Sequence, residues 1–304
     1  MDYEIIEKRV PSVDGVHALY GKLYVPSGEI KGYFHLVHGM TEHIGRYDEL
    51  LKTLASFGYL AFAFDNLGHG RTVNEKYELG FISHKNGWKL LCEDLNSFYK
   101  AVIEEYGDKP YYLYGHSMGS FIVRVAVGFT VEPEKVILSG TGGKNNLAGL
   151  GIALIRILKT FKGDRHVSKF FDKIVFGSYN KKFENEGSKR SWLTSDASVR
   201  ARYDADELCA YRFGLSALSD LITLNKIANS KKRYKTYPKT KTLLVSGKDD
   251  PVGKFGAGVL EVYNNFKKAG VPAEVKLYSG RHEVHNEPLI KDEVIKDIIN
   301  FIEK

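Results

Sequence analysis

The chain has few cysteines and no long apolar run. Its 304 residues include only two cysteines, Cys92 and Cys209. They cannot form a disulfide framework, and their spacing is not that of a metal site, so we expect a reducing compartment and no metal. No run of about 18 apolar residues is present, and the N-terminus lacks the apolar core of a signal peptide. These absences predict a soluble, cytoplasmic protein.

The composition is that of an ordinary globular protein. Hydrophobic residues make up 43% of the chain and charged residues 27%, which argues against a disordered or fibrous class. Lys and Arg number 44 and Asp and Glu 37, which gives a net charge of +7. The densest basic run, residues 230–241, has no recognised nucleic-acid module around it. We interpret this run as an exposed connection and expect no nucleic-acid partner.

Short apolar segments rich in β-branched and aromatic residues recur along the chain. Their near-continuous apolar character is typical of parallel strands buried on both faces. Six such segments cover residues 32–39, 59–68, 110–117, 134–141, 241–250 and 273–282. The intervening segments have apolar residues at three- and four-residue spacing, which predicts helices. These helices are expected at residues 46–58, 88–107, 118–131, 254–270 and 287–304.

This alternation predicts an α/β fold with a mostly parallel central sheet flanked by helices. The two N-terminal apolar runs are expected to form an antiparallel edge of the sheet. The alternation stops between residues 142 and 212. We therefore expect a core at residues 1–141 and 213–304, and a helical cap at residues 142–212, inserted after strand 6.

One helix of the expected cap is strongly apolar. It covers residues 150–161 and is interrupted by Arg156 and Lys159. A helix of this kind usually packs on a core, and the alternative is a surface that faces a membrane.

A serine between two glycines follows one of the predicted strands. Gly115, Ser117 and Gly119 fit the pattern G-x-S-x-G, and a helical pattern begins at Met118. A sharp strand-to-helix turn forces its central residue toward unfavourable backbone angles, and flanking glycines remove the Cβ atoms that would collide with the backbone. The pattern predicts a nucleophile elbow with Ser117 as the nucleophile.

A serine hydroxyl needs a base that takes its proton and a carboxylate that orients the base. Asp249 and Asp250 follow one predicted strand, and His282 and His285 follow the next. The carboxyl ends of parallel strands meet in one crevice, and Ser, Asp, His is a known order for such a triad. We favour Asp250, whose backbone is fixed by Pro251, and His282, which directly follows the end of its strand. Asp249 and His285 are the alternatives.

The same chemistry needs donors for a developing oxyanion. The segment His38-Gly39-Met40 follows a predicted strand, and Gly39 lets the chain turn there. We expect the backbone N–H groups of Met40 and Met118 to form this oxyanion hole. Several polar residues nearby are expected to brace the loops through hydrogen bonds instead of acting in catalysis. They are His38, His116, Glu42, His43 and Arg46.

Five motifs together resemble one branch of the α/β-hydrolases, the monoacylglycerol lipases and lysophospholipases of the serine aminopeptidase S33-like family. The motifs are HGMTEHIGRYDEL, FDNLGHGRT, YGHSMGS, SGKDDPVG and YSGRHEVHNE. The resemblance runs from about residue 32 to the C-terminus. It implies Ser117 as nucleophile, Asp250 as acid and His282 as base, with Met40 and Met118 at the oxyanion positions. The cap shows no motif that aligns with the family, so it leaves the substrate open.

The resemblance and the apolar cap helix favour hydrolysis of a single-chain lipid ester, such as a monoacylglycerol or lysophospholipid. A short-chain carboxylesterase or a proline aminopeptidase would use the same triad, and a noncatalytic ligand-binding protein is a further alternative. The glycine-containing stretches lack the context of a nucleotide site, so no cofactor is expected. The expected partner is a small-molecule lipid ester, with transient contact between the cap and a membrane as an option.

Overall fold

The computed structural model describes residues 2–304, apart from the side chain of Tyr77. Within this range eight strands form one sheet, in the spatial order β1-β2-β4-β3-β5-β6-β7-β8. β1 and β2 pair antiparallel at one edge, β2 pairs antiparallel with β4, and all other pairs are parallel. The strands are β1 (Tyr3–Pro11), β2 (Ala18–Pro26), β3 (Gly32–Val37), β4 (Tyr59–Phe64), β5 (Tyr111–His116), β6 (Lys135–Ser139), β7 (Lys241–Gly247) and β8 (Ala273–Tyr278).

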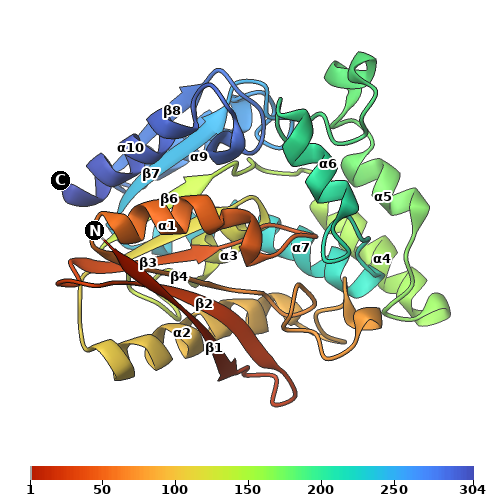
Figure 1. Cartoon of the computed structure of the whole chain (residues 1–304). Coiled ribbons are helices and arrows are strands. Elements are labelled where there is room, and N and C mark those ends of the chain that lie inside the picture. The colour runs from red at the N-terminus through yellow and green to blue at the C-terminus, as the bar shows by residue number, and fades with distance from the viewer. Residues whose placement is uncertain (1) are drawn as a thin grey trace.

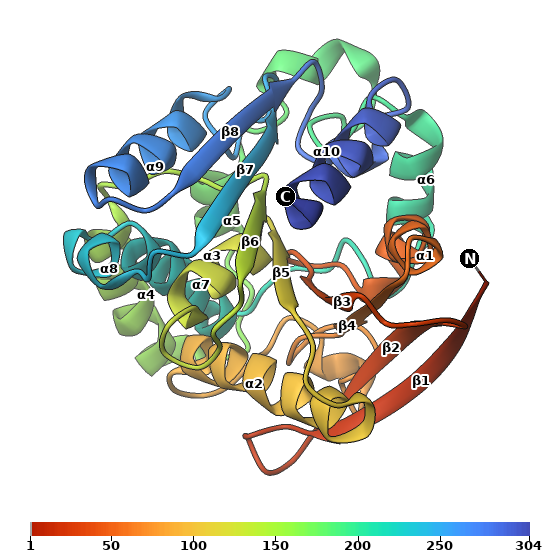
Figure 2. The ribbon, with the colours of Figure 1, turned by 90° about the vertical axis from the view of Figure 1, so that its left-hand side faces the viewer.

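The helices cover both faces of the sheet, as the continuous apolar strands require. Figure 2 shows α1 and α10 on one side and α2, α3 and α9 on the other, and the two largest clusters of buried hydrophobic residues divide in the same way. The α-helices are α1 (Asp48–Ser56), α2 (Gly87–Tyr106), α3 (Met118–Ala126), α4 (Ala148–Lys162), α5 (Lys169–Phe176), α6 (Ala197–Ala205), α7 (Leu215–Ala228), α8 (Lys231–Thr236), α9 (Ala257–Lys268) and α10 (Lys291–Glu303). The predicted α/β-hydrolase architecture and its antiparallel edge are confirmed.

Two local predictions were wrong. The helix expected at residues 118–131 ends at Ala126, because Val127 leaves the helical conformation and forms an isolated bridge with Val131. The basic run 230–241 is not simply an exposed connection. It contains α8, in which Arg233 is only 4% exposed and donates to the carbonyl oxygens of Arg124 and Val127. Its guanidinium therefore binds carbonyls around the C-terminal end of α3.

Helices α4, α5 and α6 follow β6 and lie together at one end of the sheet (Figure 1). We call residues 142–212 the cap; its boundaries as a separate unit stay a prediction. The inner face of α4 packs as expected, with Ile152 and Ile155 buried, but its outer face leaves Leu150, Leu154 and Phe161 exposed. No helix of the described residues has the length and apolar character needed to cross a bilayer.

Candidate active site

Ser117 lies at the turn between β5 and α3, in a strained backbone conformation. Its φ is 52° and its ψ −118°, a region that residues with a side chain rarely adopt. A Cβ on Gly115 would lie 2.6 Å from the carbonyl oxygen of Gly119, and a Cβ on Gly119 would collide with the carbonyl oxygen of Val37. The glycines thus allow the backbone packing that this turn requires, and such strain is typical of functional sites.

Asp250 and His282 form a buried hydrogen-bonded pair. The Nδ1 of His282 lies 3.0 Å from Oδ1 of Asp250, and both residues are almost fully buried. Oδ1 of Asp250 also accepts from the Val252 N–H at 2.8 Å, and Oδ2 accepts from the Ser246 hydroxyl at 3.2 Å. Asp249, the alternative acid, points away and pairs with Lys182 near the surface. The structure therefore brings Asp250, and not Asp249, to His282.

The environment of His282 favours its protonated form. Burial lowers the pKa of His282, but the charge of Asp250 and the hydrogen bond to it outweigh burial and raise the pKa above its usual value. Glu283 and Glu42 act in the same direction. A histidine held by one carboxylate and able to accept a proton has the properties of a general base.

The other histidines are placed differently. His285 stacks on Tyr47 with ring centroids 4.8 Å apart, and burial lowers the pKa of His285 to about 4. His116 contacts the His282 ring at 4.6 Å and bonds to Ser139, while His38 accepts from the backbone N–H of Asn66 at 2.9 Å. The bracing roles expected for His38 and His116 agree with these contacts.

The expected oxyanion donors lie in the loop after β3 and at the start of α3. Met118 is the first residue of α3, so its N–H has no acceptor within its own helix. The Met40 N–H has no hydrogen-bond acceptor among residues 2–304. The next residue, Thr41, has a φ of 54°, which is unfavourable for a β-branched residue. A Cβ on Gly39 would lie 3.1 Å from the Cβ of Ser117, so this loop passes directly beside the serine.

A buried ionic cluster connects this loop to the loop that carries His282. Glu42 accepts from the Gly39 N–H at 2.6 Å and also bonds to Arg46. Arg46 donates two parallel hydrogen bonds to Glu283, at 2.8 and 2.7 Å. The loop-to-loop bonding expected of Glu42 and Arg46 is confirmed, and the cluster fixes two loops that lie far apart in the sequence.

A cavity of about 770 Å³ lies between the sheet and the cap. Ser117, His282, Met40 and Met118 all contribute to its wall, whereas Asp250 lies behind His282. Apolar side chains form part of the wall and include Phe121, Val175, Phe176, Leu221 and Ile222. The predicted nucleophile, base and oxyanion donors thus share one cavity with an apolar interior.

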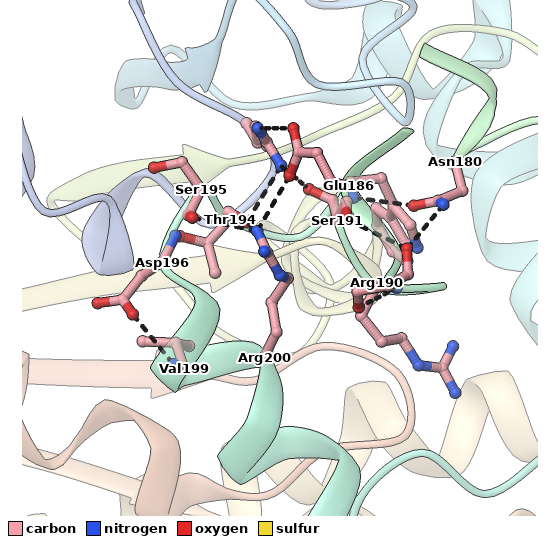
Figure 3. A network of polar contacts seen from close by, with 12 residues as sticks. Asn180, Glu186, Arg190, Ser191, Thr194, Ser195, Asp196, Val199 and Arg200 are labelled. Atoms are coloured by element: carbon pink, nitrogen blue, oxygen red, sulfur yellow. Dashed lines mark hydrogen bonds and ion pairs between the residues drawn. The ribbon is translucent and has the colours of Figure 1, made fainter. Parts of the chain in front are cut away.

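The cap takes part in the site through residues that carry no motif. The centre of the Trp192 ring lies 5.2 Å from the centre of the His282 ring, and the Tyr203 hydroxyl donates to the carbonyl oxygen of Thr41 at 3.0 Å. Figure 3 shows the polar network around this part of the cap, with Glu186 and Arg200 directed toward each other. Sequence reasoning missed these residues, because nothing in the spacing of cap residues indicates which loop they contact.

Among the described residues, His43, Asp206 and Cys209 have potential ligand atoms within 4.8 Å of one another. His43 Nε2 lies 2.8 Å from an Asp206 oxygen, and its Nδ1 accepts from the Gly45 N–H. The arrangement fits a hydrogen-bonded pair that joins the cap to the loop after β3.

Known proteins that are similar to this chain support its assignment to the α/β-hydrolases. The family model described as Serine aminopeptidase, S33 matches residues 28–289. A monoacylglycerol lipase from Mycolicibacterium smegmatis is 26% identical over 97% of this chain and 98% of its own length. A monoglyceride lipase homolog from Monkeypox virus is 25% identical over 94% of this chain and 92% of its own length. The solved structure of a carboxyl esterase from Bacillus coagulans has a TM-score of 0.92 and 27% identity, over 98% of both chains. With most of its length matched by the family model, the chain belongs to the Serine aminopeptidase, S33 family of α/β-hydrolases.

Proposed function

We propose that this protein is a serine hydrolase that cleaves carboxylic esters of single-chain lipids. The observation that carries the proposal is the buried Asp250–His282 pair, whose histidine shares a cavity with Ser117 on its strained turn. The lipases and the esterase to which the chain is similar support the same reaction class.

The proposed reaction has two steps. His282 takes the proton of Ser117 while the serine oxygen attacks the ester carbonyl, and the protonated His282 then gives this proton to the leaving alcohol. Water repeats the sequence on the acyl-enzyme, which releases the fatty acid and regenerates the serine. Asp250 holds the tautomer of His282 and stabilises the imidazolium that forms in each step.

The backbone N–H groups of Met40 and Met118 would bind the oxyanion of each tetrahedral intermediate. Both residues contribute to the cavity wall. Loss of one such donor typically lowers turnover by roughly 10² to 10³. The strained conformation of Thr41 and the bond from Glu42 to the Gly39 N–H would hold the Met40 amide in place.

The cavity supports a substrate with one acyl chain. Its volume of about 770 Å³ is within the usual range for a small-molecule site, and its apolar wall can accept a hydrocarbon chain. The names of the similar lipases favour a monoacylglycerol.

One observation favours a lysophospholipid as a second candidate. Lysine side chains from four segments contribute to the cavity wall, namely Lys144, Lys169, Lys173, Lys189 and Lys254. Asp172, the single aspartate of the wall, pairs with Arg212. An anionic phosphate on the alcohol would interact favourably with these lysines of the cavity wall.

A substrate panel on the wild type and Ser117→Ala tests the proposal. We expect hydrolysis of monoacylglycerols and lysophospholipids, with long acyl chains preferred over p-nitrophenyl acetate, and loss of activity in Ser117→Ala. Activity that survives this substitution would refute the proposed nucleophile. Preference for a proline arylamide would instead indicate an aminopeptidase. Failure of a fluorophosphonate to label Ser117 in the folded protein would indicate a noncatalytic binding protein.

We propose in addition that residues 142–212 act as a lid whose outer face contacts membranes. The exposed apolar side chains Leu150, Leu154 and Phe161 support this role, and basic residues such as Arg156 and Lys162 accompany them on α4. Binding to anionic liposomes at low salt should be lost in Leu154→Glu. Absence of binding by the wild type under these conditions would exclude the membrane contact.

A further inference from the structure

The loop that carries His282, residues 279–287, is bonded to the cap along its length. The His282 N–H donates to the carbonyl oxygen of Trp192 at 3.4 Å, and the Glu283 N–H donates to that of Leu193 at 2.8 Å. The Thr194 hydroxyl donates to the carbonyl oxygen of Asn286 at 3.1 Å. Residues 191–195, which we call the strap, therefore lie along this loop and are held to it by hydrogen bonds.

Arg281, the residue before His282, bonds both to Glu186 and to the strap. Its two terminal nitrogens donate to the two oxygens of Glu186, at 2.9 and 2.6 Å. One of these nitrogens also donates to the carbonyl oxygen of Ser191 at 2.5 Å. The guanidinium lies 4.2 Å from the centre of the Phe183 ring. A paired, two-point contact of this kind fixes the plane of the guanidinium as well as its position.

Glu186 joins a second arginine to the same strap. Arg200 of α6 approaches Glu186 at 3.4 Å and donates to the carbonyl oxygens of Thr194 and Ser195, at 2.8 and 3.1 Å. Figure 3 shows Glu186, Arg200, Thr194 and Ser195 converging in this way. One carboxylate therefore contacts two arginines, and both arginines donate to carbonyl oxygens of the strap, of which that of Thr194 is bonded in a buried position.

The strap bears directly on the ring of His282. Trp192 of the strap lies 5.2 Å from this ring, and His116 lies 4.6 Å from it. A Cβ added to Gly140 would lie 2.8 Å from Cε1 of His282, so the backbone at Gly140 also packs closely against this ring. Movement of the strap would remove Trp192 from this enclosure and release the backbone N–H groups of His282 and Glu283.

We infer that Arg281 and Glu186 are positioning residues, which lock the strap onto the His282 loop so that the ring is correctly placed only when this part of the cap is docked. The inference rests on the proposed function, because it assumes that His282 acts as the base. According to this inference, the strap supports the His282 loop during turnover and takes no part in any opening movement of the cap.

The test measures turnover per active site in Arg281→Met, Glu186→Gln and the double variant. A short ester serves as substrate, and the final extent of fluorophosphonate labelling counts the active sites. A misplacement of about 1 Å can cost 10²-fold, so we expect kcat per site to fall roughly 10- to 100-fold, with KM within about two-fold of the wild type. Because the two residues act as a unit, the double variant should lose no more than the more impaired single variant.

Arg202→Met is the matched control, because Arg202 is an exposed arginine of α6 whose side chain donates a hydrogen bond only to Ser198 among the described residues. Its kcat should remain that of the wild type. An unchanged kcat per site in Arg281→Met, even with lowered thermal stability, would overturn the inference. If Arg281→Met does not fold, Glu186→Gln, at an exposed position, provides the same test. Activity that survives in Ser117→Ala would refute the proposed function instead, so the two failures are distinguishable.

Discussion

The two parts of the cap are attached to the rest of the molecule in different ways. The part with α4 and α5, residues 148–176, buries one apolar face and leaves large apolar side chains of the other exposed. The part from residue 186 to 210 is bonded to the loop after β3 through Tyr203 and to the His282 loop through Arg281. The first part can shape and cover the cavity, whereas the second supports the groups that we propose carry the chemistry.

This comparison indicates that a cap inserted in one stretch of sequence need not act as one unit. Polar, buried and directional contacts resist displacement more than an apolar face that can slide. We therefore expect substitutions of the residues that form these contacts, in the second part and in the core loops, to affect stability and turnover together. Substitutions on the outer face of the first part should leave both nearly unchanged.

The largest effect is expected from Arg46→Met, in the ionic cluster that joins the two core loops. This substitution leaves Glu42 and Glu283 buried without their cation. Removal of one partner from a buried ion pair typically costs about 3–5 kcal/mol in the free energy of unfolding. Urea denaturation measures this loss. Arg190→Met, which breaks a more exposed pair with Asp204, should cost less than about 1 kcal/mol, and equal losses would contradict the distinction.

A smaller effect is expected from Tyr203→Phe, which separates the second part of the cap from Thr41. The buried carbonyl oxygen of Thr41 keeps the Ala210 N–H as a donor but loses the tyrosine hydroxyl, at a cost of about 1 kcal/mol. Strained Thr41 follows Met40, whose N–H we propose as an oxyanion donor. Loss of the contact that supports Thr41 should therefore also lower kcat. Tyr263→Phe on α9, outside the cavity, is the control. A stability loss with normal kcat per active site would show that Thr41 does not depend on this contact.

The pH dependence gives a third comparison. His282 must be neutral to act as a base, and its pKa is raised, so the acid limb of kcat/KM should lie above pH 6.5. Glu283→Gln removes a negative charge that raises this pKa, so the limb should move to lower pH. Glu49→Gln, in an exposed pair with Lys291, should leave it in place. A limb that stays fixed in Glu283→Gln would mean that another group controls the profile.

The smallest effect is expected from Phe170→Ala on α5. Phe170 is 65% exposed, so the free energy of unfolding should change by less than about 0.5 kcal/mol. Its neighbour Phe171 is 6% exposed, and Phe171→Ala should cost about 3 kcal/mol. Thermal or urea denaturation of both variants tests whether only one face of the first part is packed.

Much of the core could be predicted from local patterns. Continuous apolar strands, helical spacing and glycines after helices are short-range signals, and the order of strands and helices follows from them. Gly107, for example, ends α2 with a φ of 80°. The end of α3 could not be predicted, because the bridge between Val127 and Val131 replaces helical bonding there. The burial of Arg233 depends on the carbonyls of Arg124 and Val127, around the C-terminal end of α3, which are 109 and 106 residues distant in the chain.

The sequence by itself determined the α/β architecture and the residue types available for acyl transfer, because chain order and G-x-S-x-G carry that information locally. The sequence favoured Asp250 over Asp249, and the tertiary structure shows how the two differ, since one carboxylate meets His282 and the other meets Lys182. Only the tertiary structure divided the cap into two parts and brought Glu186 to Arg281. Those contacts join segments 95 residues apart, and their formation depends on the packing of the whole fold rather than on any local pattern.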